Sequence, residues 1–141
     1  MIDIENKVFN SIASVLRTEF SGISVYGEYI DVPSSFPCVT IVEDDNYTYQ
    51  RSQDTSNTEH HANIVYTVNV YSNLTNGKKD QAKKIMDRID SLMQGMKFTR
   101  SMRNQIPNTD RTIYRITARY NAVVEEAHEI DGNAVYQIYR S

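Results

Sequence analysis

The sequence predicts one α+β domain in which a largely antiparallel sheet is covered on one side by two helices. Three observations predict this class. Residues 62–72 alternate between apolar and polar side chains with a period of two, as in a half-buried strand. Residues 82–96 repeat apolar side chains every three or four positions, as in a helix with one apolar face. The length of 141 residues suits a single domain, 1–141, that needs neither a disulfide nor a metal to fold.

The chain before this strand and helix predicts one helix and two strands. Asp3 can cap a first helix over residues 4–20, where apolar side chains recur at helical spacing. A short strand follows at residues 23–25. Two prolines then make residues 32–37 a rigid connector, because proline fixes its own φ and disfavours helix in the residue before it. The next strand covers residues 38–42.

A long polar stretch follows this strand and extends to His61. It is either a long hairpin that turns near residues 54–57 or a loop that orders on contact with a partner. Both alternatives make it a projecting arm. An arm without an apolar face cannot belong to the core, so it is the best candidate for an assembly contact. The candidate contact residues are Glu43, Asp44, Asp45, Tyr47, Tyr49, Arg51, Asp54 and Glu59.

The second helix is expected to end near Gly95, where a C-terminal cap fits. Alternation then predicts a strand at residues 97–103 and the longest strand at residues 112–124. The dipeptide 131–132, Asp-Gly, is a hairpin turn signal, and residues 135–139 form the last strand. The predicted order is therefore α-β-β-β-α-β-β-β, with helices packed on one side of the sheet.

Charge is unevenly distributed along the chain, whose net charge is −3. Residues 1–63 hold three Lys or Arg and ten Asp or Glu, a net −7, whereas residues 64–141 hold twelve and eight, a net +4. Such asymmetry can give identical subunits complementary faces. The alternative is that each half is simply solvated.

No pattern of catalytic or metal-binding residues stands out. His60 and His61 are adjacent, so on a strand they point to opposite faces and cannot chelate one metal in the usual way. The acidic run 43–45 lacks the spaced ligands of a calcium loop. There is no phosphate-binding glycine loop and no Gly-x-Ser-x-Gly. The single cysteine, Cys38, is expected in a buried strand. We therefore expect no enzyme, metal or cofactor; a small ligand-binding or enzyme domain is the weakest alternative.

Four arginines on the two strands after the second helix raise a nucleic-acid alternative. Arg100, Arg103, Arg115 and Arg119 could form a basic strand face that contacts phosphates. They could equally form the solvent side of a sheet or one half of a charged subunit interface. The lysines of the second helix are interleaved with aspartates, which is typical of an ordinary solvated helix face.

Targeting signals and membrane segments are not expected. No apolar run approaches the roughly 18 residues that span a bilayer. The first residues have neither a basic start nor an apolar block. The sequence thus predicts a soluble protein made in the cytoplasm.

The whole pattern of elements points to a family. It consists of an amphipathic helix (2–20), a proline connector (33–37) leading into a strand (38–42), the polar arm, a strand and helix (64–71 and 78–93) and a long strand (114–120). In this pattern the chain resembles the tail terminator, tail completion and head–tail joining proteins of long-tailed bacteriophages.

This resemblance implies a small α+β fold that assembles into a hexameric ring on top of the tail tube. The ring would stop tube polymerisation and offer a surface to the head-completion or connector protein, leaving a channel where DNA is contacted non-specifically at most. The arm would reach a neighbouring copy, the tube or the connector. The protein would then be made in the bacterial host cytoplasm and reside in the virion. The family has no compact motif that assigns contact residues in this chain.

Overall fold

The computed structural model describes residues 3–48, 61–107, 110–130 and 133–140. They form two helices and six strands, so the α+β class is confirmed. In chain order the elements are α1 (Glu5–Glu19), β1 (Ser24–Tyr26), β2 (Cys38–Thr48), β3 (His61–Ser72), α2 (Lys78–Gly95), β4 (Thr99–Ile106), β5 (Tyr114–Ile130) and β6 (Asn133–Arg140). Neither of these two helices is long and apolar enough to cross a membrane.

The sheet is mixed. Its lateral order is β1-β2-β3-β5-β4, and β6 pairs with β5 outside this path. Four of the five pairings that the structure describes are antiparallel, and the exception is β1 with β2. The parallel pairing arises because the connector after Tyr26 carries the chain back to the starting end of β1 before Cys38 begins β2.

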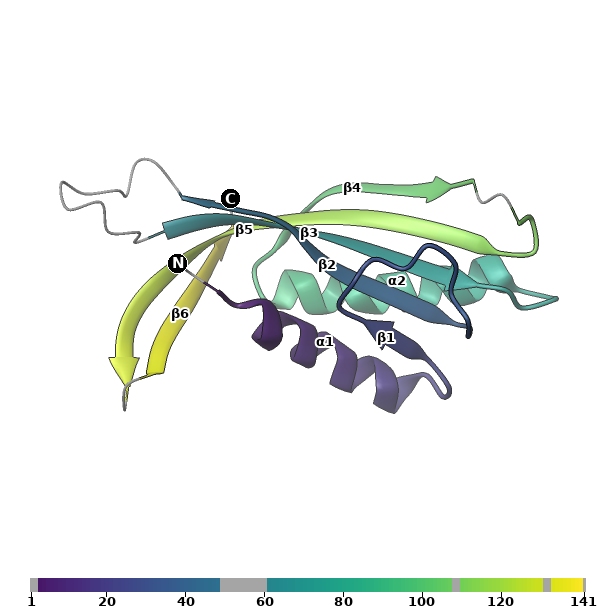
Figure 1. Ribbon diagram of the computed structural model, residues 1–141, viewed down its shortest axis with the longest axis horizontal. Coiled ribbons are helices and arrows are strands. Elements are labelled where there is room, and N and C mark those ends of the chain that lie inside the picture. The colour runs from purple at the N-terminus through teal and green to yellow at the C-terminus, as the bar shows by residue number, and fades with distance from the viewer. Residues whose placement is uncertain (1–2, 49–60, 108–109, 131–132, 141) are drawn as a thin grey trace.

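Strand β5 organises the sheet because three other strands pair with it. Strand β3 follows one of its edges as far as Glu125. Strands β4 and β6 share the other edge end to end, β4 opposite residues 115–121 and β6 opposite residues 122–130. Figure 1 shows the consequence: the β5–β6 hairpin bends away from the β2–β3 hairpin at the same end of the sheet.

The hydrophobic core lies between the sheet and the two helices, which Figure 1 shows on the same side of it. Alternate residues of β3 face the helices, and their side chains are fully buried, as the period of two predicts. Both helices present one apolar stripe to the sheet. Burying each large apolar side chain stabilises the fold by about 1.5–3 kcal/mol. The principal residues of this layer are Ile64, Tyr66, Val68, Val70, Val8, Ile12, Leu16, Ile85, Met86, Ile89 and Met93.

The prediction that Asp3 caps α1 is only partly correct, because the cap position is held by Ile4, which makes no side-chain hydrogen bond there. The Asp3 carboxylate accepts a hydrogen bond from the Glu5 backbone N–H at 3.1 Å, although Ile4 is the residue that precedes the first helical turn. A side-chain acceptor at this point satisfies one of the backbone donors that a helix start leaves free.

The end of α2 differs from the expectation of a cap at Gly95. Gly95 is the last helical residue, and Lys97 holds the left-handed backbone conformation, with φ 69°. The Lys97 N–H donates to the Gln94 carbonyl at 2.9 Å and the Phe98 N–H donates to the Met93 carbonyl at 2.9 Å, which is a Schellman motif. The left-handed cap residue lies two positions later than expected, because the chain must turn Phe98 back into the core, where its side chain is fully buried.

Candidate assembly surfaces

The first part of the predicted arm belongs to the sheet. Strand β2 runs antiparallel to β3 out to the pair Thr48–Ala62, so Glu43, Asp44 and Asp45 are strand residues. This part of the arm is therefore paired strand rather than loop. The remaining candidates, Tyr49, Arg51, Asp54 and Glu59, lie outside the described residues.

Asp44 occupies a β-bulge and contacts the opposite half of the sequence. Glu43 pairs with Tyr66 and Asp45 with Val65, so the register shifts at Asp44. The Asp44 carboxylate accepts a hydrogen bond from the Thr67 hydroxyl and forms an ion pair with Arg119 at 3.2 Å. The sequence analysis assigned Asp44 to the assembly arm and Arg119 to a basic strand face, but the two side chains contact each other within one subunit.

Two other described residues of the arm, Glu43 and Tyr47, lie on different faces of the sheet. Glu43 points to the helix side, where the Tyr66 hydroxyl donates to it at 3.3 Å. Burial raises the pKa of the Glu43 carboxyl, and the nearby carboxylates of Glu5 and Asp3 raise it further. Tyr47, by contrast, is opposite Asn63 on the other face and is 51% exposed. Tyr47 is therefore available to a partner, whereas Glu43 is largely occupied within the subunit.

Two of the predicted basic residues face the helix layer. Arg100 and Arg103 on β4 form ion pairs with Asp90 at 3.1 Å and Asp87 at 2.7 Å, both on α2. The Tyr120 hydroxyl also donates to Asp90, at 2.8 Å. These contacts join the edge strand β4 to the helix beneath it.

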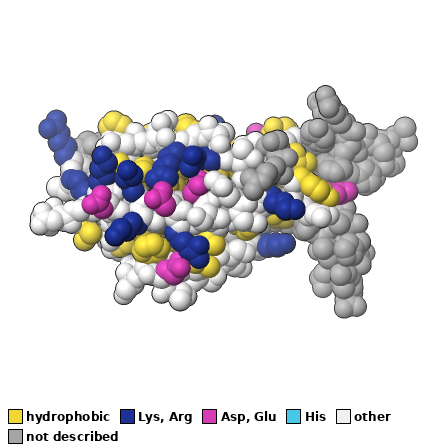
Figure 2. Space-filling model, turned by 180° about the vertical axis from the view of Figure 1, so that it is seen from behind, with side chains coloured by type: hydrophobic (Ala, Val, Ile, Leu, Met, Phe, Trp, Pro, Cys, Tyr) yellow, Lys and Arg dark blue, Asp and Glu magenta, His cyan; other side chains and the backbone are white. Residues whose placement is uncertain are grey.

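The other two arginines lie on the opposite face of the sheet. The Arg115 guanidinium donates twice to the Asn69 side-chain oxygen, at 3.1 and 3.0 Å, and lies 5.4 Å from the centroid of the Tyr71 ring. Arg119 contacts Asp44. The four arginines therefore form two pairs on two faces rather than the single basic face considered from the sequence. Figure 2 likewise shows Lys and Arg side chains interspersed with Asp and Glu on the face it presents.

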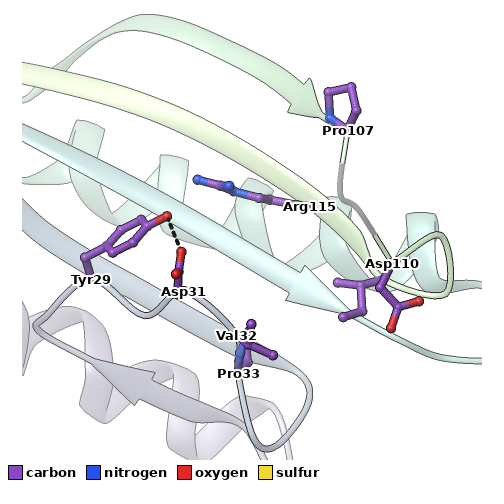
Figure 3. Close-up of a pocket in the computed structure, with 8 residues that line it drawn as sticks. Tyr29, Asp31, Val32, Pro33, Pro107, Asp110 and Arg115 are labelled. Carbon is purple, nitrogen blue, oxygen red and sulfur yellow. Dashed lines mark hydrogen bonds between the residues drawn. The ribbon is translucent and has the colours of Figure 1, made fainter.

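A groove of about 520 Å³ lies beside Arg115 on the face without helices. Figure 3 shows the connector residues Tyr29 and Asp31 on one side of it and Asp110 on the other. The Tyr29 hydroxyl donates to Asp31 at 3.2 Å. Two carboxylates near one guanidinium give the groove mixed charge. The sequence did not indicate this groove, because its walls come from two connections that are distant in the chain and meet only through the strand order.

Two kinds of reactive site considered from the sequence, a metal centre and an activated thiol, can be checked against the described residues. Within residues that the structure describes, no group of three or more His, Cys, Asp or Glu could hold a metal ion. Cys38 is fully buried, and burial raises the pKa of its thiol to about 11, which leaves it protonated and unreactive near neutral pH. The positions of His60, His61 and His128 side chains lie outside the described part of the chain.

Comparison of the sequence with protein-family models and with curated proteins finds no match to either.

Proposed function

We propose that this protein is a structural assembly protein of a long-tailed bacteriophage or prophage. It forms a ring, hexameric in the virion, at the head-proximal end of the tail. The ring stops polymerisation of the tail tube and joins the tail to the head-completion or connector protein. Its partners are thus other copies of itself, the tube protein and the connector, and DNA in the lumen is contacted non-specifically at most.

The observation that carries this proposal is the pair of hairpins that continue past the helix-covered core. Strands β2 and β3 remain paired out to Thr48 and Ala62, and β5 and β6 remain paired out to Ile130 and Asn133. Beyond Glu125, the described part of β5 pairs with β6 alone. A two-stranded ribbon is marginally stable in water by itself. Two such ribbons at one end of the sheet would be stabilised by the surface of an assembly (Figure 1).

The nucleic-acid alternative has less support from the arrangement of the arginines. Arg100, Arg103 and Arg119 each contact a carboxylate of the same subunit, and Arg115 contacts an amide oxygen. A phosphate would have to displace these acceptors on two different faces. Steep, salt-dependent binding needs several phosphates contacted together.

The test uses purified tail tubes. Adding the protein to growing tubes should place density at one tube end in negative-stain electron micrographs and should stop elongation. Light scattering of the protein released from capped tubes should give a mass near six chains. Tubes that keep growing with bare ends would overturn the proposal. A monomer whose oligonucleotide affinity falls steeply with salt would instead support the nucleic-acid alternative.

A further inference from the structure

The charge asymmetry of the sequence becomes an asymmetry between the two lateral edges of the sheet. The strand order places β1 and β2, with α1 below them, at one edge and β4 at the other, while α2 lies below β3, β5 and β4 (Figure 1). Residues 3–48 hold two Lys or Arg and eight Asp or Glu, a net −6. Residues 78–106 hold eight and three, a net +5. An ion pair between Glu19 on α1 and Arg88 on α2 joins the two segments within the subunit at 2.6 Å. The charge that remains makes the β1–β2 edge acidic and the β4 edge basic.

The acidic edge is also hollowed and partly apolar. A groove of about 410 Å³ lies between the start of α1 and the connector after β1. Phe9, Tyr26 and Ile30 form its apolar wall, and Glu5 and Glu28 stand at its rim. Tyr26 is 37% exposed although it is a strand residue. Aromatic side chains next to charged rims are typical of the centre of a protein interface.

The basic edge offers cations that are not used within the subunit. Asp87 and Asp90 point from α2 toward β4, as their ion pairs show. Lys83 and Lys79 lie four and eight residues before Asp87, so helical spacing places them on this same side of α2. Both lysines are exposed, and neither has an ion-pair partner among the described residues.

An apolar side chain and an open strand edge accompany these lysines. Met102 on β4 is 36% exposed. The outer edge of β4 has no neighbouring strand in the described sheet. An exposed strand edge with unpaired backbone groups favours contact with another chain.

We infer that the acidic edge of one copy, centred on the groove between α1 and the connector, binds the basic α2–β4 edge of the next copy. A twofold contact through either edge would bring like charges together, whereas a head-to-tail contact pairs opposite charges. Head-to-tail contacts are the heterologous kind that generate rings. The inference rests on the proposed function, since it names the surfaces that would close the proposed ring.

The test reverses the charge of each edge separately and then together. One variant carries Glu5→Lys and Glu28→Lys, and a second carries Lys79→Glu and Lys83→Glu. Each alone places like charges across the contact, so sedimentation velocity at about 50 mM salt should show self-association weakened by about tenfold or more. All four positions are exposed. Circular dichroism and thermal unfolding of each variant verify that it is folded.

The charge-matched control combines both pairs of substitutions, so that the two edges again carry opposite charges, each reversed from its original sign. A protein with all four substitutions keeps the net charge of the chain and should associate as the unaltered protein does. An equimolar mixture of the two double variants should also associate, because each supplies the edge that the other lacks. About 500 mM salt should weaken association of the unaltered protein.

Two results would overturn the inference and leave the proposed function standing. One is association that persists in both double variants. The other is an unaltered protein that stays monomeric at low salt yet caps tail tubes. Bare, growing tubes would overturn the proposed function itself.

Discussion

Replacing Lys97 with glycine should stabilise the protein. Lys97 holds a left-handed backbone, φ 69°, at the Schellman motif that ends α2. A side chain in this conformation costs about 1–2 kcal/mol relative to glycine. Glycine also makes the unfolded chain more flexible, which offsets about 0.5–1 kcal/mol of that gain. The net expectation is a rise of about 0.5–1 kcal/mol in the free energy of unfolding.

Gly95→Ala is the matched test, because the sequence and the structure predict opposite signs. In the structure Gly95 is helical, and a Cβ there would meet nothing within 4 Å. Alanine should then stabilise the helix by about 0.5–1 kcal/mol. If Gly95 were instead the left-handed cap that the sequence indicates, alanine would cost about 1–2 kcal/mol.

Urea denaturation followed by far-UV circular dichroism gives the free energy of unfolding of both variants. In a thermal scan of the same proteins, each kcal/mol should move the melting temperature by about 2–4 °C in a domain of this size. A Lys97→Gly protein that is less stable than the unaltered chain would refute the left-handed assignment of Lys97. A loss above about 0.5 kcal/mol in Gly95→Ala would refute the placement of the helix end.

Three further predictions concern the core and buried titratable groups. Ile89→Ala should lower the free energy of unfolding by about 2–5 kcal/mol in urea denaturation, because Ile89 is fully buried. The control, Ser91→Ala at an exposed position of the same helix, should change it by under about 0.5 kcal/mol. An equally small effect at Ile89 would mean that another face of α2 is buried. Because the pKa of Glu43 is raised in the folded protein, ionising this carboxyl lowers the free energy of unfolding as pH rises past the ordinary glutamate range. Glu43→Gln should therefore stabilise the protein at pH 7 and lose this advantage near pH 4. An equal gain at both pH values would contradict an origin in the ionisation of Glu43. Cys38, buried and with a pKa of about 11, should react with a thiol reagent at pH 8 only after unfolding, and rapid labelling of the folded protein would contradict its burial.

The sequence alone determined the elements that have a strong local period. The alternation in β3 and the three-to-four spacing in α2 identify their buried faces, because a residue's side on a strand or helix depends only on its position within that element. The structure confirms these faces: Ile64 and Val68 are fully buried on β3, and Ile85 and Ile89 on α2. The α+β class follows from the same local patterns.

The cap position of α2 could not be predicted from the local sequence. Gly95 is the natural cap by residue type, yet Gly95 is the last helical residue and Lys97 takes the left-handed cap position. Phe98 then enters the core and packs edge-to-face on Tyr66, with ring centroids 5.5 Å apart. Burial of an aromatic ring stabilises more than one strained backbone residue costs. The burial that favours this helix end thus depends on Tyr66 of β3, a strand that precedes α2 in the chain.

The candidate surfaces were decided by tertiary structure. Bulges at Asp44 in β2 and after Arg100 in β4 shift the strand register, and a shift of one residue moves a side chain to the other face. The contact of Asp44 with Arg119 depends on these registers. The charge asymmetry was visible in the sequence, but only the strand order places the acidic segment that ends with β2 and the basic strand β4 at opposite edges. Strand order is set by contacts between distant segments, which no local period records.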